Sequence, residues 1–202
     1  MKKKITLGIA FLCFFMTAKA QVYQKGNVLF DVYYGAPNLY TATFKAAYTD
    51  NTYYTGITTS SLGPLGIKAE YLLSEKIGIG VHFNDAVSNL SATYTDPSTS
   101  QTYTYTAKSN VMRIFPTLNV HMGNSSNFDP YFSFGLGYNH RSTTFSVNDP
   151  NYTGSVTYKS LVPVATRIEF GMRYFFTDNI GINAFVGLPG GALVGAGLSV
   201  KL

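Results

Sequence analysis

Cysteine, tryptophan and charged side chains are scarce in this chain of 202 residues. The single cysteine, Cys13, lies inside an N-terminal apolar run and not at the edge position that a lipid-modified cysteine needs. Only 12% of the residues are charged, which is low for a soluble surface. No stretch beyond the N-terminal region offers the continuous apolar run of a spanning helix. A membrane role would therefore have to be carried by β-strands.

The first 20 residues have the order of a secretory signal peptide. Lys2 to Lys4 precede an apolar run from Ile5 to Met16, and Ala18-Lys19-Ala20 follows it. A membrane anchor is the alternative, but this apolar core has about a dozen residues where a spanning helix needs roughly 20. We therefore expect cleavage after Ala20, which divides the chain into a signal peptide, residues 1–20, and one domain, residues 21–202.

The basic character of the chain belongs mostly to this signal peptide. The chain has 15 basic and 10 acidic residues, and residues 1–20 hold four of the basic ones and none of the acidic ones. The mature protein therefore has 11 basic residues against 10 acidic ones. It lacks the clustered Lys and Arg of a nucleic-acid-binding surface, so we expect no nucleic-acid partner.

Alternating apolar and polar side chains recur about eight times behind the signal, which is the pattern of two-faced β-strands. From Val162 to Phe176 every second residue is apolar or neutral, and Arg167, Glu169 and Arg173 fall between them. The expected strands span roughly residues 27–34, 66–73, 77–84, 110–122, 132–139, 162–176, 180–188 and 192–202. Pro116 falls inside the fourth strand and requires an irregularity there, because proline cannot donate to a β-ladder.

The expected connections alternate in length. Those after the second, fourth and sixth strands are short, whereas those after the first, third and fifth cover roughly residues 35–63, 85–109 and 139–160. Only the last hairpin, residues 189–191, breaks this rule. The asymmetry is typical of a transmembrane barrel. Further alternation around residues 96–98 and 148–151 predicts hairpins that extend the strands, with bulges where their phase leaves the register.

Side-chain volume indicates which face of such a barrel is outside. Soluble barrels of the lipocalin kind show the same alternation with the faces exchanged, but an eight-stranded barrel has an interior just wide enough for its side chains. One face here is crowded with Phe, Ile, Leu, Met and Tyr, and the other carries glycines among a few charged residues. We therefore predict an all-β fold, an eight-stranded antiparallel up-and-down transmembrane β-barrel, with the apolar face in lipid.

This orientation directs charged side chains into the lumen. The expected lumenal charges are Asp31, Lys68, Glu70, Arg113, Arg167, Glu169, Arg173 and Lys201, joined by His82 and His121. Buried charges must be paired or hydrated, and we expect Asp31 to pair with Lys68 or Lys201. The first interpretation is a salt-bridge network that braces and closes the barrel. The alternative, based on five basic against three acidic residues, is an anion-preferring path or a site for an acidic ligand.

The signal peptide, eight strands, loop asymmetry and apolar last strand from Ala192 to Leu202 resemble the small outer-membrane β-barrel proteins of Gram-negative bacteria, of the OmpX, OmpW and OmpA-barrel groups. The chain departs from them in ending on Leu202, where many end in an aromatic residue, and in having no peptidoglycan-binding domain after the barrel. The resemblance implies contact with outer-membrane lipid and lipopolysaccharide, insertion by the outer-membrane assembly machinery, and long loops outside the cell. No cofactor is expected.

Functions in this group range from structural or adhesive roles to passage of small hydrophobic molecules, and the fold does not choose between them. Aromatic loops favour contact surfaces. The expected loops contain Tyr40, Tyr48, Tyr53, Tyr54, Tyr94, Tyr103, Tyr105, Tyr152 and Tyr158. Our first hypothesis is a structural or surface-interaction barrel with an extracellular partner bound through these loops, and the alternative is an OmpW-like passive conduit for small molecules.

Catalysis and metal binding are not expected. Some small outer-membrane barrels are lipid hydrolases, and His140 and Ser142 share a strand face, which allows a base to reach a hydroxyl. A third, orienting carboxylate is not evident, since Asp149 lies in a loop tip. A lipid hydrolase therefore stays a remote alternative. His82 and His121 are isolated from any Cys or carboxylate repeat, which favours lumenal hydrogen bonding over a metal site.

Overall fold

The computed structural model describes residues 23–49, 53–123, 127–149, 154–160 and 162–202. The predicted signal peptide, residues 1–20, lies outside the described residues. The described elements are β1 (Val28–Ala36), α2 (Leu39–Thr49), β2 (Tyr54–Leu72), β3 (Ile77–Thr95), β4 (Thr102–His121), β5 (Phe128–Val147), β6 (Ser155–Lys159), β7 (Val164–Phe175), β8 (Ile180–Leu188) and β9 (Val194–Lys201). No helix among these residues is long and apolar enough to cross a membrane.

Eight of the strands form a closed antiparallel barrel. Strands β1 to β5 and β7 to β9 pair with their neighbours along the chain, β1 pairs with β9, and β7 pairs with β5. Strand β6 lies outside this ring and pairs only with residues 142–146 of β5. The prediction of an eight-stranded up-and-down barrel is therefore confirmed, and the short β6 is an addition to it.

The seam between the first and last strands depends on a glycine at a point of close backbone approach. Gly197 of β9 lies opposite Tyr33 of β1. A Cβ atom at Gly197 would collide with the carbonyl oxygen of Val32 and with the Cα atom of Tyr33. These are backbone atoms of the paired strand, so they cannot move aside as a side chain can. Glycine at this position lets β1 and β9 meet and close the barrel.

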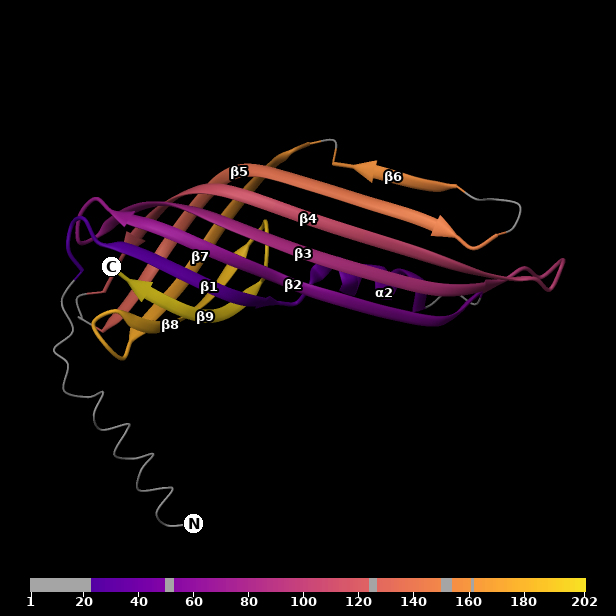
Figure 1. The fold of residues 1–202 in the computed structure, drawn as a ribbon, viewed down its shortest axis with the longest axis horizontal. Helices are drawn as coiled ribbons and strands as arrows, with labels where there is room; N and C mark the ends of the chain where they lie inside the picture. Colours follow the sequence, from indigo (N-terminus) through magenta and orange to yellow (C-terminus); the bar gives the residue numbers. More distant parts are fainter. Residues whose placement is uncertain (1–22, 50–52, 124–126, 150–153, 161) are drawn as a thin grey trace, which may run out of the picture.

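Four strands are much longer than the others and leave the barrel together (Figure 1). Strands β2 to β5 have 19 or 20 residues, whereas β1, β7, β8 and β9 have 8 to 12. The shorter lengths are close to the 9 to 11 residues that a strand needs to cross a bilayer. We call the surplus the projecting sheet: residues 54–62, 87–95, 102–110, 140–147 and β6. The barrel end that carries it is the extended end, and the opposite end, where the C-terminus lies, is the turn end.

The predicted loop of residues 35–63 has more structure than expected. It contains α2, which the sequence reasoning did not predict, and the first part of β2. The helix lies against β2 and β3. The amide of Asn38 donates to the carbonyl oxygen of Val87 over 3.3 Å, and the Thr41 hydroxyl donates to the Ser88 hydroxyl over 2.9 Å. Since Ser88 faces the same way as the lumenal residues of β3, α2 lies over the extended end of the lumen.

The expected irregularities occur at particular places. The register of β2 against β3 shifts between Thr55 and Thr58 and again between Leu62 and Leu65, in a segment for which the sequence predicted no bulge. In contrast, β3 and β4 pair without interruption from Ile77 to Thr95, so the expected phase slip is absent there. At Pro116 the pairing of β4 with β5 is interrupted, which confirms the expected irregularity.

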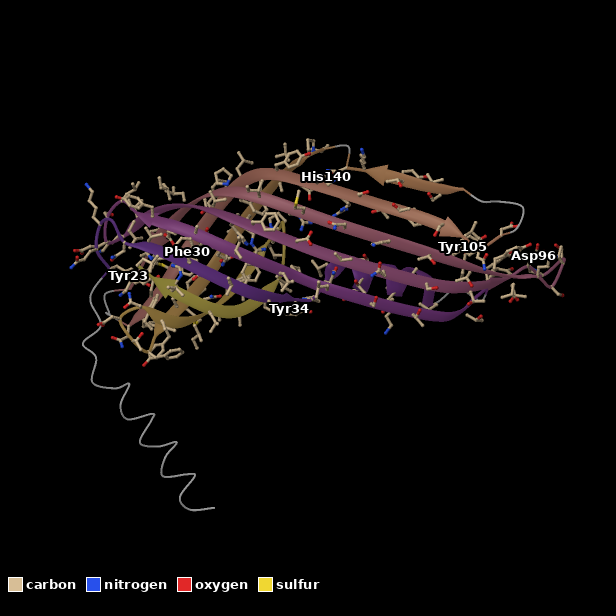
Figure 2. The ribbon with its side chains drawn as sticks, in the orientation of Figure 1. Tyr23, Phe30, Tyr34, Asp96, Tyr105 and His140 are labelled. Atoms are coloured by element: carbon tan, nitrogen blue, oxygen red, sulfur yellow. The ribbon has the colours of Figure 1, made fainter. Side chains whose placement is uncertain are left out.

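An apolar belt surrounds the barrel. Its outward-facing side chains include Phe30, Val32, Tyr34, Ile67, Tyr71, Ile79, Val81, Ile114, Leu118, Phe132, Phe134, Leu136, Tyr138, Ile168, Phe170, Met172, Tyr174, Ile182, Val186, Leu198 and Val200. Phe170, at mid-height, is 41% exposed. Tyr34 and Tyr138 lie near the extended end and Tyr71 and Tyr174 near the turn end, as two aromatic girdles would. Figure 2 shows Phe30 on the barrel and Tyr105 on the projecting sheet.

Candidate functional site

The lumen of the barrel is filled by side chains. Among the described residues, the largest that are fully buried include Arg167, Arg173, Tyr131, Phe115 and Phe175. An eight-stranded barrel has just enough interior to be filled in this way. At the turn end, a cluster of four buried side chains packs across the barrel: Tyr23, Leu29, Leu72 and Phe175.

Arg173 on β7 is the centre of one half of the lumenal charge network. Its guanidinium donates to three carboxylates that come from three other strands. The distances are 2.9 Å from Nη2 to Asp31 Oδ2, 3.0 Å from Nη2 to Glu70 Oε2 and 3.1 Å from Nη1 to Asp129 Oδ2. The guanidinium carbon also lies 4.2 Å from the centre of the Tyr131 ring, which is cation–π geometry. One side chain thus links strands β1, β2, β5 and β7 across the lumen.

His121 on β4 bridges two of these carboxylates. Its Nε2 atom lies 2.7 Å from Glu70 Oε1, and its Nδ1 atom lies 2.8 Å from Asp129 Oδ1. Ionised carboxylates only accept hydrogen bonds, so both ring nitrogens must donate, which requires the imidazolium form. His121 therefore acts in the network as a fourth cation beside Lys68, Arg167 and Arg173.

Glu169 on β7 is the centre of the other half of the network, nearer the extended end. Its carboxylate pairs with Lys68 and accepts hydrogen bonds from Arg167 Nη2 over 3.0 Å and from the Tyr131 hydroxyl over 3.1 Å. Lys68 also donates to the Tyr131 hydroxyl and lies 3.9 Å from the centre of the Phe185 ring. Tyr131 contacts Arg173 through its ring and Glu169 through its hydroxyl, so it joins the two halves.

The central network balances its charges. It contains four carboxylates, Asp31, Glu70, Asp129 and Glu169, and four cations, Lys68, His121, Arg167 and Arg173. Fully buried ions need such pairing together with additional hydrogen bonds. The expected pairing of Asp31 with Lys68 or Lys201 is wrong. Asp31 instead accepts from Arg173 and from the Ser199 hydroxyl, because the planar guanidinium can reach three carboxylates at once.

The turn between β8 and β9 folds across the extended end of the lumen. Arg167 Nη1 donates to the carbonyl oxygen of Ala192 over 2.9 Å, and the Asn84 amide donates to that of Gly190 over 3.2 Å. Asn84 belongs to β3, which is separated from β9 by β1 and β2 in the ring, so the turn reaches across the opening. Gly190 has φ +83°. The other connections at this end are long, whereas this one is short. It lies over the lumen.

The predicted lumenal charges divide into three locations. Six of them, Asp31, Lys68, Glu70, Arg167, Glu169 and Arg173, meet in the central network. Lys201 lies at the turn end, 5.2 Å from the centre of the Phe175 ring. Arg113 lies at the extended end and donates to Asn84 over 3.4 Å. His82 contacts the Tyr33 hydroxyl, at 2.6 Å from its Nε2 atom.

Sequence reasoning missed two central members, Asp129 and Tyr131. The fifth strand was expected to begin at residue 132, whereas β5 begins at Phe128. Counting the alternation backwards from Ser133 would have placed Tyr131 and Asp129 on the lumenal face. Asp129 reduces the predicted excess of basic residues, and the central network balances because Arg113 and Lys201 lie outside it.

The weak hydrolase candidate lies away from this network. His140 and Ser142 are on the outward face of β5, and Arg141 is on the opposite face. Among the described residues no hydrogen bond joins His140 to Ser142. Figure 2 places His140 where β5 leaves the barrel.

No protein-family model matches the chain, and no curated protein matches it. Three solved structures are similar to it at low identity. The N-terminal β-barrel domain of Pseudomonas aeruginosa OprF is 15% identical, with a TM-score of 0.47, and the match covers 89% of this chain and 100% of that one. The Pseudomonas aeruginosa outer membrane protein OprG is 13% identical, with a TM-score of 0.48, and the match covers 91% of this chain and 99% of that one.

The third is Ail, the attachment invasion locus protein of Yersinia pestis, solved with the heparin analogue sucrose octasulfate. It is 12% identical, with a TM-score of 0.43, and covers 88% of this chain and 96% of that one. The strand pairing of the chain itself makes it a closed eight-stranded up-and-down β-barrel, to which these solved structures are similar.

Proposed function

We propose that the protein is an integral outer-membrane barrel with a closed lumen, whose projecting sheet contacts a partner outside the cell. The observation that carries this proposal is the division of the long strands into two parts. Their barrel parts have an apolar exterior, and their outer parts form a sheet with small, polar and tyrosine side chains. The apolar exterior of the barrel parts is suited to contact with lipid, and the outer sheet is suited to contact with a protein surface.

The apolar belt supports the membrane placement. Within the described barrel strands, the outward positions between the two tyrosine girdles carry no charged residue. A continuous apolar surface of this size on a soluble monomer would drive association. The orientation with the turn end in the periplasm and the projecting sheet outside follows from the usual placement of short turns and long extensions in such barrels.

The filled lumen supports a closed barrel over a passive conduit. Tyr131, Arg167 and Arg173 are at most 1% exposed, the Tyr23 cluster packs across the turn end, and the β8–β9 turn folds across the extended end. A small solute would have to displace paired charges, which costs several kcal/mol for each ion left unpaired.

We expect the purified protein to give no stable conductance steps in planar bilayers, because the packed side chains leave no continuous water path. Liposome swelling with small sugars should likewise match protein-free liposomes. The matched comparison is the variant Tyr131→Ala with Phe115→Ala, which removes two of the largest buried rings and should produce measurable ion flux. Reproducible conductance steps from the wild-type protein would instead favour the conduit.

The tyrosines of the projecting sheet supply the surface-contact part of the proposal. Tyr54, Tyr94 and Tyr105 from three neighbouring strands lie side by side, with ring centres 5.6 to 6.1 Å apart. They share the face that continues the lumenal side of β3 and β4. Aromatic groups that are rigid and partly exposed are the usual anchors of protein contacts.

We expect the triple variant Tyr54→Ala, Tyr94→Ala, Tyr105→Ala to lose about tenfold or more in binding of protein-displaying cells to host-cell or matrix surfaces, since anchor residues each contribute more than about 1 kcal/mol. The matched control replaces Thr55, Thr93 and Thr104 with Ala, which lie on the same strands and face the other way. Equal binding by both variants and the wild type, at equal surface display, would count against this role.

A further inference from the structure

A cavity of about 300 Å³ lies at the extended end of the barrel, above the β8–β9 turn. We call it the mouth cavity. It is lined by Asn38 and Thr43, before and within α2, by Arg113 and Arg141 of β4 and β5, and by Gly190 and Gly191 of the turn. Its volume is at the lower end of the range for small-molecule sites, roughly 300 to 1,000 Å³.

The two arginines lie on neighbouring strands and face the same way. In the pairing of β4 with β5, Arg113 is opposite Asn139 and Arg141 is opposite Val111, so the two arginines are diagonal neighbours on the lumenal face. The charges that act on the Arg113 guanidinium include the like charges of Arg141 and Arg167. None of the described residues that line the mouth cavity is an aspartate or a glutamate, and no described carboxylate forms an ion pair with Arg113.

The mouth cavity brings like charges together. Two guanidinium groups line the same partly enclosed space. A third cation, Arg167, binds Glu169 and the carbonyl oxygen of Ala192 in the β8–β9 turn. Like charges held close together in a partly desolvated space repel each other, and an anion placed between them would relieve that repulsion.

We propose that the mouth cavity binds a phosphate monoester, carried either by a small sugar or by the headgroup of a lipid. The planar guanidinium fork offers two parallel hydrogen bonds to phosphate oxygens, so two such groups can hold one dianion between them. Asn38 and Thr43 add polar side chains to the lining beside the arginines. Gly190 and Gly191 add no side chain that would fill the space. The site requires a folded barrel and does not depend on the surface contacts proposed above.

The test uses the ¹⁵N-labelled protein in an uncharged detergent, titrated with glucose 6-phosphate and, separately, with glucose. We expect saturable shifts of the Gly190 and Gly191 amide signals with the phosphate ester and none with glucose. Arg113→Gln and Arg141→Gln should each weaken binding about tenfold to hundredfold, because each removes charge-assisted hydrogen bonds. Arg113→Lys, which keeps the charge but not the fork, should fall between the wild type and Arg113→Gln.

The control is Lys108→Gln, which removes one positive charge from the exposed outward face of β4 and should leave binding unchanged. A heat-shift gel confirms that each variant is folded. The same titration with short-chain phosphatidic acid in bicelles separates the two sources. Binding of either ligand through both arginines supports the site and names its source. The proposed site would be wrong if neither ligand shifted the amide signals. It would also be wrong if Lys108→Gln weakened binding as much as the arginine variants do.

Discussion

Replacing Arg173 with Met should cost about 3 to 5 kcal/mol of folding free energy, which is the usual consequence of removing one partner from a buried ion network. Asp31, Glu70 and Asp129 all accept hydrogen bonds from this guanidinium, and all three are at most 2% exposed. His121 would be the only cation left among them. The measurement is urea unfolding in lipid vesicles, followed by far-UV circular dichroism and by gel mobility, since the chain has no tryptophan.

Two comparisons separate the loss of the network from the loss of a charge. Lys108→Met removes a positive charge from the outward face of the projecting sheet and should change stability by less than about 0.5 kcal/mol. Adding Glu70→Gln to Arg173→Met removes one of the stranded carboxylates and should recover part of the stability. If the double variant is no more stable than Arg173→Met, and Lys108→Met is equally damaged, the proposed role of Arg173 in the network is wrong.

The barrel could be predicted from the sequence because alternating apolar and polar residues identify each strand and its two faces. Residues such as Arg167, Glu169 and Arg173 lie at every second position among apolar ones, and only a two-faced strand separates them. The helix α2 could not be predicted in this way, because its position over the barrel end depends on contacts with β3, which is distant in sequence. The strands can therefore be predicted from local sequence, whereas the helix that covers the barrel end cannot.

The membership of the lumen could be predicted, but its pairing could not. Assigning a residue to a face needs only its position in the two-residue alternation of its strand. That alternation placed Asp31, Lys68 and Arg173 inside the barrel. Pairing depends on side-chain length and on the strand opposite across the lumen. Arg173 on β7 reaches Asp31 on β1, although β8 and β9 lie between these strands in the ring. Reasoning from adjacent strands favoured Lys68 or Lys201 as the partner of Asp31, whereas in the structure Asp31 pairs with Arg173 across the lumen.

Replacing Phe170 with Arg should cost about 2 to 4 kcal/mol of folding free energy in lipid vesicles, as expected for an arginine on the lipid face near mid-membrane. Phe170 lies at mid-height on β7, between Phe132 and Val186 on the neighbouring strands. Its side chain is 41% exposed, so little packing is lost by the change itself. On a soluble barrel the same substitution would replace an exposed apolar group with a charged one and would be close to neutral.

A depth series makes this result specific to the membrane. Tyr138→Arg lies at the girdle near the extended end, where the cost should fall to about 0 to 1 kcal/mol, and Thr104→Arg on the outward face of the projecting sheet should be close to neutral. A penalty that decreases from Phe170 to Tyr138 to Thr104 follows the polarity of a bilayer, whereas a general intolerance of arginine would give equal losses. Equal losses, or a wild-type protein that stays soluble without detergent, would contradict the lipid-facing belt. The stability losses of the three variants therefore test whether the apolar belt lies in lipid, independently of any partner or ligand.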